Sequence, residues 1–96
     1  MDSTLLHNPH VGEILKQDFL EEFNLTEVAL AKAIGLEASV IKEIIQFQSI
    51  ITADIDLRLC RYFNLSEGYF LRLQNAYQIL EAKRKLGNQL TKITPI

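Results

Sequence analysis

The chain has 96 residues, 48% of them hydrophobic and 23% charged, a composition typical of one small globular domain. Twelve acidic and ten basic side chains give a net charge of −2, which excludes a protein that coats nucleic acid through bulk positive charge. The single cysteine excludes an internal disulfide. Because the chain has neither a long apolar run nor a basic leader, we expect a cytoplasmic protein without membrane contact.

Charge is unevenly distributed along the chain. The first 24 residues contain five acidic side chains and one lysine, whereas the last sixteen contain four basic side chains and one glutamate. Two interpretations of the basic end, Lys83-Arg84-Lys85, stay open. It favours the dipole at a helix C-terminus, or it steers nucleic acid or an acidic partner.

The N-terminal segment predicts an amphipathic helix. Apolar residues recur at spacings of three and four between Pro9 and Phe23. Asn8 is the expected N-cap, which places Pro9 at the first helical position, where a missing N–H costs nothing.

A second and a third predicted helix follow, separated by a tight turn. Thr26 is the expected N-cap of the second helix, which runs to Ile34 and ends at Gly35 in a left-handed conformation. The third helix spans residues 37–46. The positions expected to be buried are Val28, Leu30, Ala31 and Ile34 in the second helix, and Ile41, Ile44 and Ile45 in the third.

Two more helices complete the expected fold. Thr52 caps a fourth helix to Phe63, and Ser66 caps a long fifth helix that Gly87 ends. The inward positions of the fourth helix are Ile55, Leu59, Cys60 and Phe63. The sequence therefore predicts one all-α domain of five helices over residues 1–87, followed by a tail, 88–96.

Two short helices joined by a glycine turn, here about residues 26–46, describe a helix-turn-helix unit. In DNA-binding versions the later helix enters the major groove, and its outward side chains contact base edges. Many all-helical proteins contain a similar corner, so the spacing alone leaves DNA binding and a purely structural corner both open.

Three blocks of the chain resemble, in the same order, the HigA-like antitoxins of the Cro/CI-type helix-turn-helix class. They are HVGEILK at 10–16, LAKAIGL at 30–36 and YFLRLQNAY at 69–77. The resemblance implies a lambda repressor-like domain with a long C-terminal helix. It also implies a homodimer that binds operator DNA, represses its own promoter, and neutralises a cognate RelE-like ribonuclease toxin of a type II toxin–antitoxin module.

The resemblance and the helix-turn-helix geometry together place the functional surfaces. The residues expected to contact DNA are Thr26, Glu27, Ser39, Val40, Lys42, Glu43, Gln46, Gln48 and Ser49. The residues expected to form the dimer interface lie on one face of the fifth helix, and are Tyr69, Phe70, Leu73, Tyr77 and Leu80. Packing of this face inside its own chain is the alternative.

The chain departs from the family at the DNA-facing surface. The family usually carries a glycine and several cations between the third and fourth helices, whereas residues 46–50 read QFQSI. Glu27 and Glu37 lie at helix N-termini, where operator phosphates dock. Two interpretations follow: DNA binding is retained, or it is weakened in a protein-interaction module with Val40, Phe47 and Ile50 as a partner patch.

Nothing in the sequence predicts an enzyme or a bound cofactor. His7 and His10 are three residues apart in a segment expected to fray, with no further ligand nearby to complete a metal site. Cys60 lies on the inward face of its helix without a histidine placed to activate it, so we expect a buried thiol.

Overall fold

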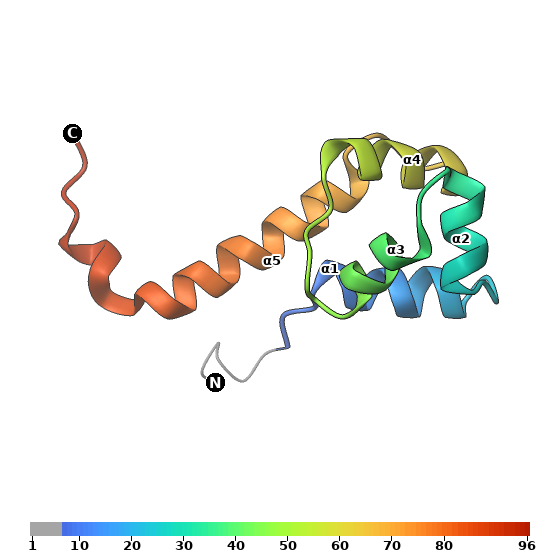
Figure 1. The fold of residues 1–96 in the computed structure, drawn as a ribbon. Coiled ribbons are helices and arrows are strands. Elements are labelled where there is room, and N and C mark those ends of the chain that lie inside the picture. The colour runs from blue at the N-terminus through green and yellow to red at the C-terminus, as the bar shows by residue number, and fades with distance from the viewer. Residues whose placement is uncertain (1–6) are drawn as a thin grey trace.

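The computed structural model describes residues 7–96, and within that range all regular structure is helical (Figure 1). The α-helices are α1 (Val11–Ile14), α2 (Glu27–Ile34), α3 (Ala38–Ile45), α4 (Ala53–Phe63) and α5 (Tyr69–Leu86). A π-helical segment, Leu15–Glu21, continues α1, and a short 3-10 helix, Gly87–Lys92, follows α5. The predicted all-α, five-helix fold is confirmed.

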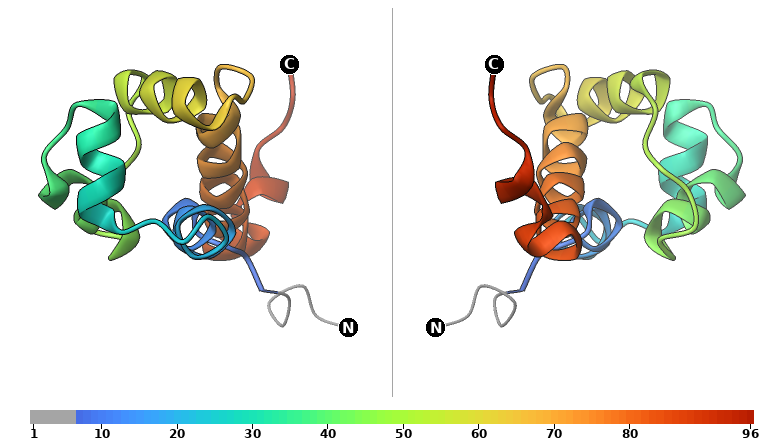
Figure 2. Two further views of the ribbon diagram at one scale, coloured as in Figure 1. Left: turned by 90° about the vertical axis from the view of Figure 1, so that its right-hand side faces the viewer. Right: turned by 90° about the vertical axis from the view of Figure 1, so that its left-hand side faces the viewer.

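The helices enclose one core. Viewed end-on in Figure 2, α2 and α3 lie on one side of the body and α5 lies on the other, with α1 and α4 between them. The second half of α5 extends beyond this body (Figure 1). Fully buried apolar side chains come from every α-helix and from the loop before α4: Val11, Leu15, Leu30, Ile41, Ile44, Ile51, Leu59 and Phe70.

The first helix begins later than its sequence predicts, and Asn8 is not its cap. The N-cap is His10, whose Nδ1 accepts a hydrogen bond of 2.9 Å from the backbone N–H of Gly12. Asn8 instead donates from Nδ2 to the Tyr77 carbonyl and to Oε2 of Glu81, both at 3.1 Å. These contacts with α5 compete with local capping, so sequence spacing alone misplaced the helix start.

The start and end of α2 agree with the sequence. Thr26 Oγ1 accepts from the backbone N–H of Ala29 at 3.0 Å, and Gly35 closes the helix at a φ of 75°. The expected burial of Val28 is wrong, because its side chain is 64% exposed. It lies in the first turn, outside the stripe of Leu30, Ala31 and Ile34 that packs into the core.

The start of α5 depends on a carboxylate from another helix. Ser66 is not the cap; the helix begins at Tyr69 after Gly68, whose φ is 89°. The buried Asp56 of α4 accepts hydrogen bonds from the backbone N–H groups of Gly68 (2.7 Å), Phe70 (2.9 Å) and Leu71 (3.2 Å). Asp56 therefore caps α5 from across the interface and locks α4 to α5.

The tail after α5 has more regular structure than its sequence predicts. Gly87 ends α5 as expected, but the chain continues as the 3-10 helix before extending. Leu90 and Ile93 of this segment are exposed, so the C-terminal end of the molecule presents apolar side chains to solvent.

Replacing Asp56 with Asn is expected to lower the free energy of unfolding by about 2–3 kcal/mol, because a charged acceptor of several buried N–H groups is lost. The measurement is urea denaturation followed by circular dichroism. The matched control is Asp54→Asn, two residues before Asp56, which removes the exposed ion pair between Asp54 and Arg58. That change is expected to cost less than about 1 kcal/mol. Equal losses in the two variants would contradict the capping role of Asp56.

Candidate nucleic-acid interface

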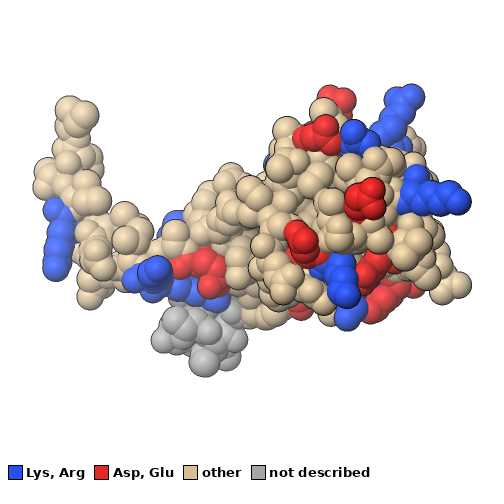
Figure 3. Space-filling view, viewed as in Figure 1, with Lys and Arg blue, Asp and Glu red and all other residues tan. Residues whose placement is uncertain are grey.

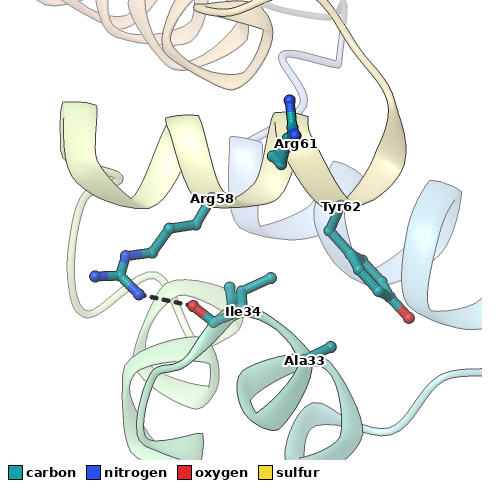
Figure 4. Close-up of a pocket in the computed structure, with 5 residues that line it drawn as sticks. All are labelled: Ala33, Ile34, Arg58, Arg61 and Tyr62. Carbon is teal, nitrogen blue, oxygen red and sulfur yellow. Dashed lines mark hydrogen bonds between the residues drawn. The ribbon is translucent and has the colours of Figure 1, made fainter.

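The turn between α2 and α3 is held by a side chain from α4. Arg58 donates from Nη1 to the carbonyl of Ile34 at 2.8 Å (Figure 4). It also donates to the Gly35 carbonyl at 3.4 Å and pairs through Nε with Asp54 at 2.6 Å. These carbonyls lie at the C-terminus of α2, where a cation also favours the helix dipole. The angle of the helix-turn-helix is therefore set by the glycine and by α4 together.

Helix α3 lies close to α1. A Cβ atom added at the buried Gly12 would overlap the backbone carbonyl oxygen of Ile44, so only glycine permits this approach. Ile41 and Ile44 are fully buried beneath the helix. The buried face of α3 is thus packed against α1, and its orientation is fixed by backbone-to-backbone contact.

The outer face of α3 carries exposed polar side chains. The predicted DNA-contact residues that are exposed in the structure are Thr26, Ser39, Lys42, Glu43, Gln46 and Gln48. Glu27 and Ser49 are half-buried, and Val40 is half-buried against the core. The arrangement brings a polar, hydrogen-bonding surface together on one helix and the loop that follows it.

The loop after α3 is shaped by aromatic contacts. Phe47 has a φ of 63°, an uncommon conformation for a bulky residue, and its ring stacks on that of His10 at a centroid distance of 4.0 Å. Phe47 is nevertheless 53% exposed, and Ile50 is 60% exposed. Two of the three residues of the suggested apolar patch are therefore at the surface, whereas Val40 is partly covered.

The end of this loop is tied to α5. The backbone N–H of Ile51 donates to Oε1 of Gln74 at 2.7 Å, and Nε2 of Gln74 donates back to the Ile51 carbonyl at 2.9 Å. One amide side chain thus satisfies both backbone groups of a buried residue, as a strand partner would. The loop between α3 and α4 is positioned by α5 on one side and by His10 on the other.

His10 joins three elements, which corrects the expectation of a fraying N-terminus. Besides capping α1 and stacking on Phe47, its ring makes an edge contact with Tyr77 of α5 at 4.7 Å. Burial lowers the pKa of His10 from the ordinary value of 6.5, and the carboxylate of Glu13 opposes that shift. Only the neutral ring leaves Nδ1 free to accept the capping hydrogen bond.

The electrostatics of the surface are mixed. Glu37 is the N-cap of α3 and makes no capping hydrogen bond with its side chain. Within residues 7–96 no ion pair involves Lys32 or Lys42, the two cations of the helix-turn-helix. On the face drawn in Figure 3, acidic and basic side chains alternate over the body, without the continuous basic patch of many DNA-binding surfaces.

The predicted dimer face of α5 points largely into its own chain. Phe70 is fully buried and contacts Phe19 at 5.1 Å, so its assignment to a dimer interface is wrong. Tyr69 makes an edge contact with Phe19, and Tyr77 contacts His10. Leu73 and Leu80 are half-buried, with Leu73 packed on the core.

Several residues that build the site were missed by sequence reasoning. Gly12, Arg58, Gln74 and Asp56 act on segments distant in the chain, and no local pattern reveals their partners. Asp56 did carry a signal, because it lies one turn before Cys60 on an otherwise apolar stripe. A carboxylate at such a position requires buried donors.

The described part of the chain, residues 7–96, brings together no group of three His, Cys, Asp or Glu side chains that would hold a metal ion. Cys60 is buried, and its Sγ lies 3.6 Å from Oδ1 of Asp56. No described helix is both long enough and apolar enough to cross a membrane.

Comparison with known proteins finds close relatives, although no protein-family model matches the chain. It is 43% identical over 75 residues to virulence-associated protein I of Dichelobacter nodosus, covering 78% of this chain and 69% of that protein. It is 26% identical over 86 residues to antitoxin HigA-1 of Vibrio cholerae, covering 90% and 81%. The solved structure of Pseudomonas aeruginosa antitoxin HigA with the higBA promoter matches with a TM-score of 0.84 and 36% identity, covering 94% of this chain and 99% of that one.

The stability of the protein is expected to fall as the pH falls through 6.5. The folded state lowers the pKa of His10, so folding favours the neutral ring. The full stability is therefore present above the ordinary pKa of 6.5, and below it protonation of His10 in the unfolded chain shifts the equilibrium toward unfolding. Urea denaturation at pH 7.5 and pH 5.5 (values chosen to bracket about 6.5) measures the effect.

The contribution of His10 is isolated by His10→Asn, which keeps a capping side chain but removes the titration. The pH dependence is expected to shrink in this variant and to persist in His7→Gln, which alters an exposed histidine paired with Glu13. An unchanged pH dependence in His10→Asn would contradict the assignment.

Proposed function

Because the chain belongs to the HigA family of antitoxins, we propose that it is the autorepressor of a type II toxin–antitoxin module and neutralises a RelE-like ribonuclease toxin. The family consists of antitoxins and transcription regulators, so the chain is not an enzyme. Its relatives include HigA solved with its promoter and antitoxin GraA solved with its operator. The site of action for such a regulator is the cytoplasm.

One observation carries the DNA-binding part of the proposal: the polar outer face of α3, held rigidly on a fold that matches a promoter-bound HigA. Ser39, Gln46 and Gln48 supply donors and acceptors for base edges, and Lys42 supplies a cation for phosphate. Thr26 and Glu27 at the start of α2, with Val40, Glu43 and Ser49, complete the proposed contact surface.

The toxin partner is inferred from family membership. A second candidate function, an antitoxin with weakened DNA binding, is favoured by Glu37 at the start of α3, which forms no ion pair within residues 7–96. It is also favoured by exposed Phe47 and Ile50 in the loop where the family resemblance implies cations. A carboxylate at a helix N-terminus opposes the phosphate that would dock there.

We propose that the dimer is centred on the protruding end of α5, beyond most of the face expected from sequence. Ile79 and Leu86 are exposed, lie seven residues apart and so share a helix face, and are continued by exposed Leu90 and Ile93. Half-buried Tyr77 and Leu80 border this surface. An apolar stripe on a helix that leaves the body is a surface that a second copy would cover.

The DNA-binding proposal is tested by gel shift on the DNA upstream of the gene. Lys42→Glu is expected to weaken binding at least about tenfold, because a phosphate contact becomes a repulsion. Glu37→Gln is expected to strengthen it, because the repulsion is removed at little cost in stability. Glu67→Gln, an exposed carboxylate of the α4–α5 turn, is the matched control. No binding by the unaltered chain at low salt would favour the second candidate function.

The dimer proposal is tested by sedimentation. Ile79→Lys is expected to shift the protein toward monomer, because a charge is placed in an apolar seam. Gln78→Lys changes the adjacent exposed residue on another face of α5 and is expected to leave the dimer intact. A dimer of equal strength in both variants would rule out this surface.

A further inference from the structure

An aromatic groove lies at the end of the body opposite the protruding half of α5. It is lined by Phe23, Leu25, Tyr62, Phe63 and Asn64, and we refer to it as the Phe23 groove. These residues follow the π-helical segment or lie at the end of α4, so none belongs to α3. The groove is separate from the proposed dimer surface, and through Leu25 it adjoins the start of α2, where Thr26 and Glu27 belong to the proposed DNA surface.

The groove exposes rings that are already arranged to receive a partner. Phe23 is 58% exposed and stacks on Phe63 at 5.6 Å, and Tyr62 makes an edge contact with the same ring at 5.1 Å. Figure 4 shows Tyr62 directed toward the side of α2, whereas Arg61 points away from it. Ordered, exposed aromatic rings are the commonest anchors of protein interfaces, because they bury large area with little loss of side-chain freedom.

Carboxylates lie on the helix that leads into the groove, and we refer to Asp18, Glu21 and Glu22 as its acidic edge. Glu21 lines the hollow next to the groove together with Leu25. Asp18, Glu21 and Glu22 precede Phe23, all three are exposed, and none forms an ion pair within the described residues. They lie toward the C-terminal end of their helix, where carboxylates oppose the helix dipole and cost stability. Lys16 is the only cation in residues 11–23. This arrangement does not stabilise the helix itself. A cationic partner docked beside the carboxylates would be attracted by them.

We propose that the Phe23 groove and its acidic edge are the docking surface for the basic toxin. This inference rests on the proposed antitoxin function. An enzyme that cleaves RNA must neutralise phosphates and therefore carries a cationic surface, which Asp18, Glu21 and Glu22 complement. The same carboxylates repel DNA, so the groove suits the toxin and not the operator. The exposed aromatic rings supply the apolar centre of the interface.

The location has a consequence for regulation. The groove takes no residue from α3, but it adjoins Thr26 and Glu27 at the start of α2. A toxin bound there leaves α3 uncovered and approaches one edge of the proposed DNA surface. The antitoxin then holds its toxin with the proposed contact residues of α3 uncovered.

The test measures binding of the full-length chain to a catalytically inactive form of the small basic protein encoded beside it, and to the upstream DNA. Phe23→Ser and the double variant Glu21→Lys/Glu22→Lys are each expected to weaken toxin binding at least about tenfold. Operator affinity is expected to change less than about twofold in Phe23→Ser and to rise in the double variant, because two carboxylates that repel phosphate become cations. If Phe23→Ser lowers the stability of the fold, the double variant Glu21→Lys/Glu22→Lys still tests the proposal, because it changes only exposed side chains.

Two matched controls define the outcome. Phe47→Ser alters the other strongly exposed phenylalanine, and Glu67→Lys reverses a carboxylate on the α4–α5 turn. Both are expected to leave toxin affinity unchanged.

The result also separates the two proposals. If the unaltered chain binds the toxin and the groove variants bind it equally well, the docking surface is overturned and the antitoxin function stands. If the unaltered chain does not bind the toxin, the antitoxin function and the docking surface both fail, whatever the operator measurement gives.

Discussion

The carboxylate of Asp56 is the contact on which the arrangement of the other helices depends. It lies buried in α4 and satisfies the first backbone N–H groups of α5, which local side chains leave without a cap. A buried charge is costly unless its oxygens are fully engaged, and here both are. Because α5 in turn holds the loop after α3 through Gln74, the cap on α5 also bears on the position of the recognition helix.

The recognition helix is positioned by contacts from three directions. Gly12 admits α3 against α1, Arg58 fixes the turn before it, and the stacked rings of His10 and Phe47 define the loop after it. Base recognition requires side chains held in a fixed register on the duplex, so a rigid support for α3 suits the proposed repressor function. His10 makes that support sensitive to protonation, because its unprotonated Nδ1 is the cap of α1.

The distribution of charge separates the proposed surfaces more clearly than the net charge does. The helix-turn-helix carries few cations, and its exposed residues are mainly polar, which favours recognition by hydrogen bonds over attraction to phosphate. The acidic end of the first helix leads directly into Phe23, whose exposed ring stacks on Phe63. A small domain with one surface for DNA and another for a basic protein accommodates both only if the two surfaces do not overlap.

The sequence by itself determined the elements that depend on local chemistry. Apolar spacing placed all five helices, Thr26 and Thr52 were recognised as caps, and Gly35 was recognised as the turn of the helix-turn-helix. The polar face of α3 followed from the same periodicity, since Ile41 and Ile44 must face the core. These features involve residues within about one helical turn of each other, where geometry fixes which side chains meet.

Only the tertiary structure decided which distant groups satisfy one another. The caps expected at Asn8 and Ser66 gave way to His10 and Asp56, and Phe70, expected at a dimer interface, is part of the core. Each error has the same physical reason: several polar side chains can satisfy a helix end, and several neighbours can cover an apolar face. The choice among them is made by packing between segments far apart in the chain.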